Sequence, residues 1–125
     1  MGVPASQRLR QQSDFRQIRS QGIRIHCGSF VFQCLRREDD SHKSSRLSVI
    51  ASRRVGNAVK RNYGKRMLRE IFRNNQCALP SSCDVVIILR SGYDTQSFTQ
   101  LEARYLKACA NVSKSMLQFG GEGSL

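Results

Sequence analysis

The alternation of apolar and polar residues predicts a chain of mixed helices and strands. Residues 13–21 are expected to form a short helix, capped by the serine at their start and stopped by Gly22. Residues 23–37 and 46–52 have the partly alternating pattern of strands, and residues 84–90 form a continuous aliphatic run. Such a run is typical of a buried central strand.

Two longer helices are predicted at residues 57–75 and 97–118. The second starts with a capping box, Ser97 with Gln100, and its apolar residues recur at helical spacing as core positions. The predicted fold is therefore a single two-layer α+β domain in the order α-β-β-β-α-β-α. The first two long strand regions, joined by a polar turn at 38–45, are expected to pair in antiparallel fashion.

The helix at residues 57–75 has two distinct stripes. Four apolar residues at four-residue spacing are expected to face the interior, with Leu68 near their edge: Val59, Tyr63, Met67 and Ile71. A basic stripe at the same spacing comprises Arg61, Lys65, Arg69 and Arg73. Like charges four residues apart destabilise an isolated helix by about 0.2–0.5 kcal/mol per pair, so the stripe favours a polyanionic partner. The lack of a side chain at Gly64 would permit close approach of another backbone.

The charge of the chain is concentrated in its first part. The net charge is +12, and residues 1–76 hold 17 Lys and Arg against 5 Asp and Glu, whereas residues 77–125 hold 4 of each. This asymmetry predicts one electropositive surface for nucleic acid. Residues 1–12 are expected to be a flexible basic arm, residues 13–118 the RNA-binding domain and residues 119–125 a flexible tail. An anionic membrane is a poorer partner because the basic helix lacks a broad apolar face.

Cysteines and acidic residues limit the chemistry that the chain could perform. Five cysteines without a Cys-x-x-Cys pair are expected to be free thiols in a reducing cytoplasm. A zinc site that uses His26 and Cys27 would lack the usual ligand spacing. The carboxylates form no cluster for Mg²⁺, and no nucleophile or phosphate-loop motif occurs. We therefore expect no catalytic residue, no metal site and no organic cofactor in this chain.

The run S-R-R-V-G-N-A-V-K-R-N-Y-G-K-R-M-L-R-E resembles the signature of the bacterial ribonuclease P protein family. Other stretches resemble family motifs in the same order, at Ser13-Asp14-Phe15, Phe30-Val31 and Leu79-Pro80. The last predicted strand and helix also match in order, so the likeness covers residues 8–118. It implies a ribosomal-protein-S5-domain-2-like fold with a left-handed β-α-β crossover, whereas the general rule predicts a right-handed one.

The resemblance also implies a function. In the family, the RNA subunit removes the 5′ leader of precursor tRNA with Mg²⁺, and the protein binds that RNA and the leader. The implied partners are ribonuclease P RNA and precursor tRNA, with no membrane and no required protein oligomer. The residues implied to contact the ribozyme RNA are Arg53, Arg54, Asn57, Lys60, Arg61, Asn62, Lys65, Arg66 and Arg69. Those implied to line the leader cleft are Phe15, Arg19, Val31 and Gln33.

Three residues depart from the family pattern. Arg19 and Gln33 stand where many members have aromatic residues, so base stacking should be weaker and polar contacts more important. Tyr63 replaces the second arginine of the usual R-N-R, and it could pack instead of binding. The alternative functions are a ribosomal or other structural RNA-binding protein without a role in cleavage, and a helix-turn-helix DNA-binding protein. The latter would need a second helix shortly after the basic one, where Pro80 and an apolar strand follow.

Overall fold

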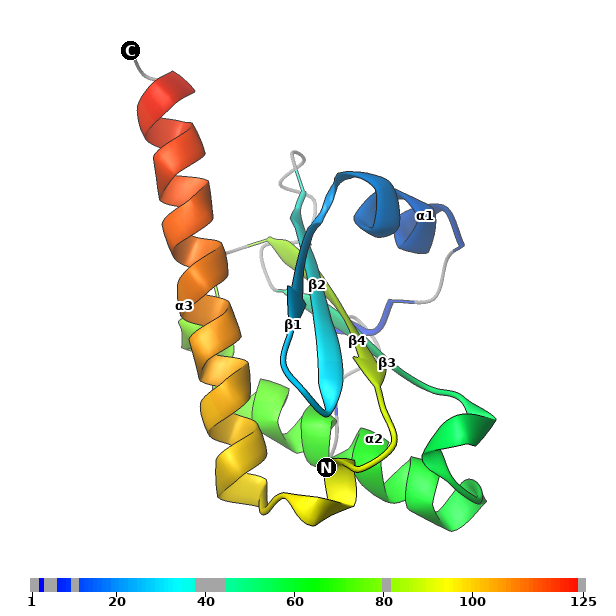
Figure 1. Ribbon diagram of the computed structural model, residues 1–125. Helices are drawn as coiled ribbons and strands as arrows, with labels where there is room; N and C mark the ends of the chain where they lie inside the picture. The colour runs from blue at the N-terminus through cyan, green and yellow to red at the C-terminus, as the bar shows by residue number, and fades with distance from the viewer. Residues whose placement is uncertain (1–2, 4–6, 10–11, 38–44, 80–81, 124–125) are drawn as a thin grey trace.

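The computed structural model describes residues 3, 7–9, 12–37, 45–79 and 82–123, with side chains up to Ser115 (Figure 1). Three helices and four strands confirm the α+β class and the predicted order. The elements are α1 (Gln12–Gln21), β1 (Ile23–His26), β2 (Phe30–Arg36), β3 (Arg46–Ala51), α2 (Ala58–Asn74), β4 (Cys83–Leu89) and α3 (Phe98–Gly123). Three short 3-10 helices connect them: η2 (Arg53–Val55), η3 (Gln76–Ala78) and η4 (Tyr93–Thr95).

The four strands form one sheet in the order β1-β2-β4-β3. β4 is central and almost wholly buried, as its aliphatic run predicts. It pairs antiparallel with β2 and parallel with β3. The expected antiparallel pairing of β2 with β3 is therefore wrong, because β4 inserts between them. β3, α2 and β4 form a β-α-β unit, and the left hand of its crossover stays a prediction.

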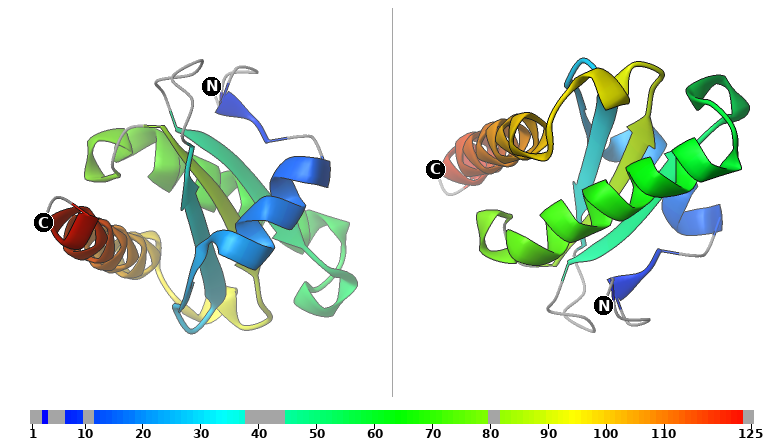
Figure 2. Two further views of the ribbon diagram at one scale, coloured as in Figure 1. Left: turned by 90° about the horizontal axis from the view of Figure 1, so that it is seen from above. Right: turned by 90° about the horizontal axis from the view of Figure 1, so that it is seen from below.

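Helices lie on both faces of the sheet (Figure 2). The larger core joins one sheet face to α2 and α3 through side chains such as Phe32, Phe72 and Tyr105. α1 covers part of the opposite face through a smaller cluster around Ile18 and Val86. The two-layer prediction thus describes the main core, and α1 adds a partial third layer.

The inward face of α2 differs from the predicted one. Its buried residues are Gly64, Leu68, Ile71 and Phe72. Val59 is 78% exposed and Tyr63 58% exposed, so both predicted core positions face solvent. Residues spaced by four do not stay on one face of a helix that has 3.6 residues per turn. The predicted apolar stripe therefore faces the core near the C-terminal end of α2 and faces solvent near its N-terminal end.

Gly64 is the point of closest approach between α2 and the end of β4. A Cβ atom at this position would lie 2.3 Å from Cδ2 of Leu89 and 2.9 Å from Cζ of Tyr93. The Tyr93 hydroxyl donates to the carbonyl oxygen of Lys60 on the same helix. The close approach predicted at Gly64 is thus made by two side chains and not by a backbone.

The first residues of the chain make contacts with the domain where the structure describes them. Val3 and Leu9 are buried, and the Leu9 amide donates to the Leu47 carbonyl oxygen over 3.0 Å. Leu9 therefore lies beside β3, and the flexibility of the arm at 1–12 and of the tail at 119–125 stays a prediction. α3 continues to Gly123, past the predicted end at Gln118. All but the last residue of the predicted polar turn at 38–45 lie outside the described residues.

Candidate nucleic-acid interface

A groove of about 530 Å³ lies between α1 and the sheet, and we call it the central groove. Its apolar surface comes from the half-buried ring of Phe15 and from β-strand residues, and arginines stand along its walls. Among the described residues, no acidic side chain lines it. The lining residues are Gln12, Phe15, Arg16, Arg19, Arg24, Gln33, Ile50, Val86 and Ile88.

Three of the four predicted leader-cleft residues line the central groove: Phe15, Arg19 and Gln33. Val31 does not. It is 1% exposed and lies between His26 and Ile88 on the neighbouring strands, so it has no surface left for a ligand. Of the other lining residues, Gln12 and Arg16 come from α1, and the rest come from positions of β1, β3 and β4 that face α1. The sequence did not show which face of the sheet α1 would cover.

The position of α1 is fixed by packing and by charge. Ile18 is buried against the sheet, and Asp14 lies 3.7 Å from Nη2 of Arg46. Arg46 in turn makes a two-pronged contact with the buried Asp84, at 2.8 and 2.9 Å, and Arg37 also pairs with Asp84. This arrangement connects the first helix to β3 and β4, so the walls of the central groove are held in place without a ligand.

The basic residues at the start of α2 face solvent. Asn57 caps the helix, since its side-chain oxygen accepts from the Lys60 amide at 2.9 Å. Several predicted RNA-binding residues are exposed, and we call them the basic helix face: Arg53, Arg54, Asn62, Arg66 and Arg69. Ile50 of the central groove lies three residues before Arg53, so β3 leads from the groove to this face. The two positive surfaces are therefore neighbours.

The other cations of α2 are paired with carboxylates or partly buried. Lys60 Nζ lies 2.9 Å from Asp94, and this hydrogen-bonded pair lowers the pKa of the Asp94 carboxyl and raises that of Lys60. Arg73 pairs with Glu70 in the last turn. Arg61 and Lys65 are half-buried beside the sheet, and Nε of Arg61 is buried with no hydrogen-bond partner in the described structure. The stripe of four cations is therefore not one uniform surface.

Tyr63 and Val59 add apolar surface to the solvent side of α2. Tyr63 lies about one turn before Arg66 and Val59 about one turn before Tyr63, and both are well exposed. The sequence left open whether Tyr63 packs or binds, and its exposure now favours binding. An exposed aromatic ring among cations is the arrangement on which unpaired bases stack.

The described residues offer little for acid–base or metal chemistry. No group of three His, Cys, Asp or Glu side chains comes together among them in a way that could hold a metal ion. Asp84 is enclosed by arginines. Burial raises the pKa of the Cys27 thiol to about 11 and that of Cys109 to about 12, which leaves both protonated at neutral pH. All five cysteines are free, and only Cys77 is exposed.

Comparisons with known proteins point to one family. The sequence model described as Ribonuclease P matches residues 3–113. The ribonuclease P protein component of Streptococcus pneumoniae is 30% identical over 99 residues, which is 79% of this chain and 78% of that protein. The RNase P protein from Thermotoga maritima superimposes with a TM-score of 0.73 at 29% identity, covering 84% of this chain and 96% of that one. The Staphylococcus aureus RNase P protein gives 0.70 at 25% identity, with 85% and 96% covered. No helix in the described part of the chain is long and apolar enough to span a membrane.

Proposed function

Because this chain belongs to the ribonuclease P protein family, we propose that it is the protein subunit that assists removal of the 5′ leader from precursor tRNA in the cytoplasm. The basic helix face binds the ribonuclease P RNA, and the central groove holds the single-stranded leader. The RNA performs the endonucleolytic hydrolysis. No protein oligomer is required.

The observation that carries this proposal is the composition of the central groove. It combines an aromatic ring, an apolar sheet surface and three arginines, and the described part of the chain adds no acidic residue to its lining. Single-stranded RNA offers bases to stack and phosphates to neutralise, which matches both components. A duplex exposes mainly phosphates and 2′-hydroxyls, and it would leave the apolar part of the groove unused.

Mg²⁺ enters the proposal through the RNA. No group of three His, Cys, Asp or Glu side chains that could hold a metal ion comes together among the described residues, and we assign the ion to the RNA. The contribution of the protein is electrostatic. Its exposed arginines replace counterions around crowded phosphates, which lowers the Mg²⁺ concentration needed to assemble RNA and substrate.

Reconstitution with a bacterial ribonuclease P RNA tests the proposal. At low Mg²⁺ and near-physiological salt, the protein should accelerate leader removal over the RNA alone. A ribosomal or other structural RNA-binding protein would bind RNA in the same assay without accelerating cleavage. Absence of any gain would therefore refute the proposed function.

A variant pair separates the central groove from general charge. Arg19→Gln removes a cation that lines the groove. Arg36→Gln removes an exposed cation that does not line this groove and does not belong to α2. Arg19→Gln should weaken binding of precursor tRNA more than binding of leaderless tRNA. Arg36→Gln should affect both equally, through the overall charge alone.

A further inference from the structure

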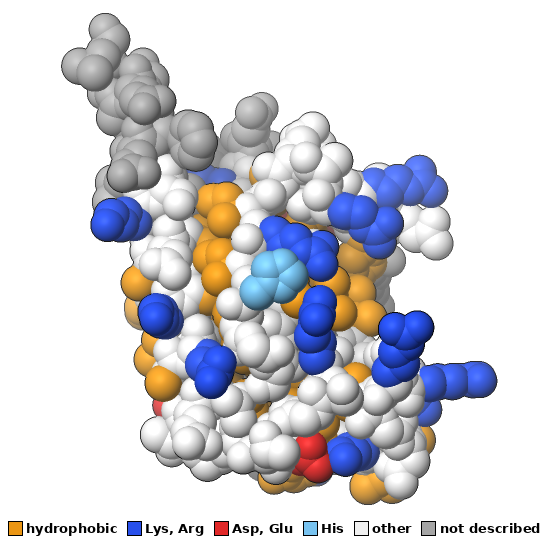
Figure 3. Space-filling model, in the orientation of Figure 1, with side chains coloured by type: hydrophobic (Ala, Val, Ile, Leu, Met, Phe, Trp, Pro, Cys, Tyr) orange, Lys and Arg blue, Asp and Glu red, His pale blue; other side chains and the backbone are white. Residues whose placement is uncertain are grey.

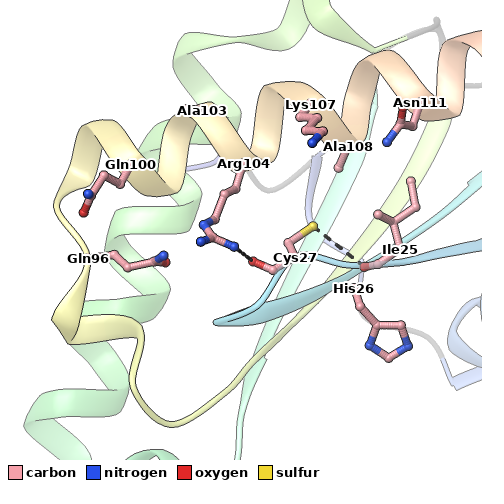
Figure 4. Close-up of a pocket in the computed structure, with 10 residues that line it drawn as sticks. All are labelled: Ile25, His26, Cys27, Gln96, Gln100, Ala103, Arg104, Lys107, Ala108 and Asn111. Atoms are coloured by element: carbon pink, nitrogen blue, oxygen red, sulfur yellow. Dashed lines mark hydrogen bonds between the residues drawn. The ribbon is translucent and has the colours of Figure 1, made fainter.

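A second groove, of about 640 Å³, lies between β1 and α3, and we call it the edge groove (Figure 4). None of the residues implied by the family signature lines it. Its apolar lining residues are Ile25, Ala103 and Ala108. The polar lining residues are His26, Cys27, Gln96, Gln100, Arg104, Lys107 and Asn111.

Arg104 is held in a fixed position at the end of this groove. Its Nη1 donates to the Cys27 carbonyl oxygen at 2.9 Å, and Figure 4 shows the side chain reaching from α3 to the turn after β1. With the Gln96 amide oriented to satisfy its neighbours, the Gln96 oxygen accepts from Nε and Nη2 of Arg104 at 2.9 and 3.0 Å. Gly28 leaves room for the guanidinium, since a Cβ there would lie 2.6 Å from Nη1. Neutral partners thus fix the guanidinium in place without cancelling its charge.

The edge groove carries two cations, Arg104 and Lys107. Among the described residues, no acidic side chain lines it. Glu102, the acidic residue nearest to them on α3, is turned elsewhere, because it accepts from Nδ2 of Asn75 at 2.9 Å. Lysine and arginine side chains are spread over the face seen in Figure 3, and acidic ones show only near its lower edge. The edge groove therefore complements an anion that also carries polar edges and flat apolar surface.

The edge groove and the central groove lie on either side of β1. Arg24 lines the central groove and His26 lines the edge groove, two residues further along the same strand and about 7 Å away. Figure 4 shows the His26 ring pointing away from α3. Because side chains alternate along a strand, Arg24 lies on the same side of β1 as His26. These two side chains form a polar ridge over which an extended strand of nucleic acid can pass from one groove to the other.

The sheet order sets the direction of such a path. α2 and the basic helix face follow β3, at one edge of the sheet, and the edge groove follows β1, at the other. A strand that leaves the catalytic RNA near α2 crosses the central groove before it reaches β1. We propose that the edge groove binds the part of a long single-stranded leader that lies farther from the cleavage site. This inference rests on the proposed function and extends it to a second binding site.

The test uses the reconstituted holoenzyme and a series of precursor tRNAs with leaders of increasing length. Lys107→Gln removes an exposed cation of the edge groove, and Arg36→Gln serves as the charge-matched control away from both grooves. Wild type should bind more tightly once the leader passes a threshold length. Lys107→Gln should lose about three- to tenfold in affinity beyond that threshold only, and its salt slope should fall by about 0.7 there. Arg36→Gln should keep the threshold.

The outcomes separate this inference from the proposed function. If Lys107→Gln weakens the affinity for precursor tRNA equally at every leader length, the effect comes from the overall charge of the protein. If the affinity is unchanged at every length, the edge groove does not bind RNA. Either result overturns the second site while wild type still accelerates cleavage of short-leader substrates. If wild type accelerates cleavage of no substrate, the proposed function fails first. Circular dichroism of both variants checks that the fold is retained.

Discussion

Replacing Gly64 with alanine tests how tightly α2 is seated on the sheet. A methyl group there would lie 2.3 Å from Cδ2 of Leu89, and ordinary van der Waals contact begins near 3.4 Å. The two atoms must therefore separate by more than about 1 Å. Leu89 is 2% exposed and Tyr93 1% exposed, so neither has free space into which it can move.

Two opposing effects set the size of the change. Alanine is favoured over glycine in a helix by about 1 kcal/mol. Overpacking a core costs about 1–3 kcal/mol, and displacement of Tyr93 would also weaken its hydrogen bond to the Lys60 carbonyl oxygen, worth about 0.5–1.5 kcal/mol. The crowding should win, and we expect Gly64→Ala to lower the free energy of unfolding by about 1–2 kcal/mol.

Urea unfolding followed by circular dichroism measures this difference. Asn62→Ala is the matched control, because Asn62 lies on the exposed side of the same helix and alanine should leave stability unchanged or slightly raised. In a double-mutant cycle, Leu89→Ala should relieve part of the cost of Gly64→Ala, with a coupling of about 0.5–3 kcal/mol. A Gly64→Ala protein as stable as wild type, or an absence of coupling, would refute the tight seating inferred here.

Three further predictions concern charge, thiols and the exposed aromatic ring. Asp84→Asn removes the buried carboxylate shared by Arg37 and Arg46 and should destabilise the fold by about 3 kcal/mol; an unchanged urea midpoint would contradict this. An alkylating reagent should modify one cysteine, Cys77, in the native protein and all five in denaturant, as mass spectrometry can count. Tyr63→Ala should weaken binding of ribonuclease P RNA by about five- to a hundredfold without changing stability, and Tyr63→Phe should bind like wild type; equal binding by the alanine variant would remove the ring from the interface.

The sequence predicted the local elements well because capping and periodicity are local properties. The helix predicted from residue 57 begins there, with Asn57 as its cap, and the aliphatic run at 84–90 became the central strand. Strand pairing was not local. The insertion of β4 between β2 and β3 depends on how α2 crosses the sheet, which no pattern within either strand encodes.

The candidate site was predicted in part for the same reason. Exposed arginines such as Arg53 and Arg66 were recognisable from the family signature and from charge. The edge groove was not, because it is built from β1 and from α3, which are separated by more than seventy residues. The ion pair between Lys60 and Asp94 is also a long-range contact, and it engages a cation that the family resemblance placed among the RNA-binding residues.

The structure changes the reason why such a basic helix is stable. From the sequence, repulsion within the stripe seemed to require a polyanion. Each like-charge pair costs about 0.2–0.5 kcal/mol, whereas burial of a side chain such as Leu68, Ile71 or Phe72 contributes about 1.5–3 kcal/mol. Packing on one face therefore outweighs repulsion on the other, and α2 forms before RNA arrives. Its arginines are presented on a rigid support, so the free energy of RNA binding is not spent on folding the helix.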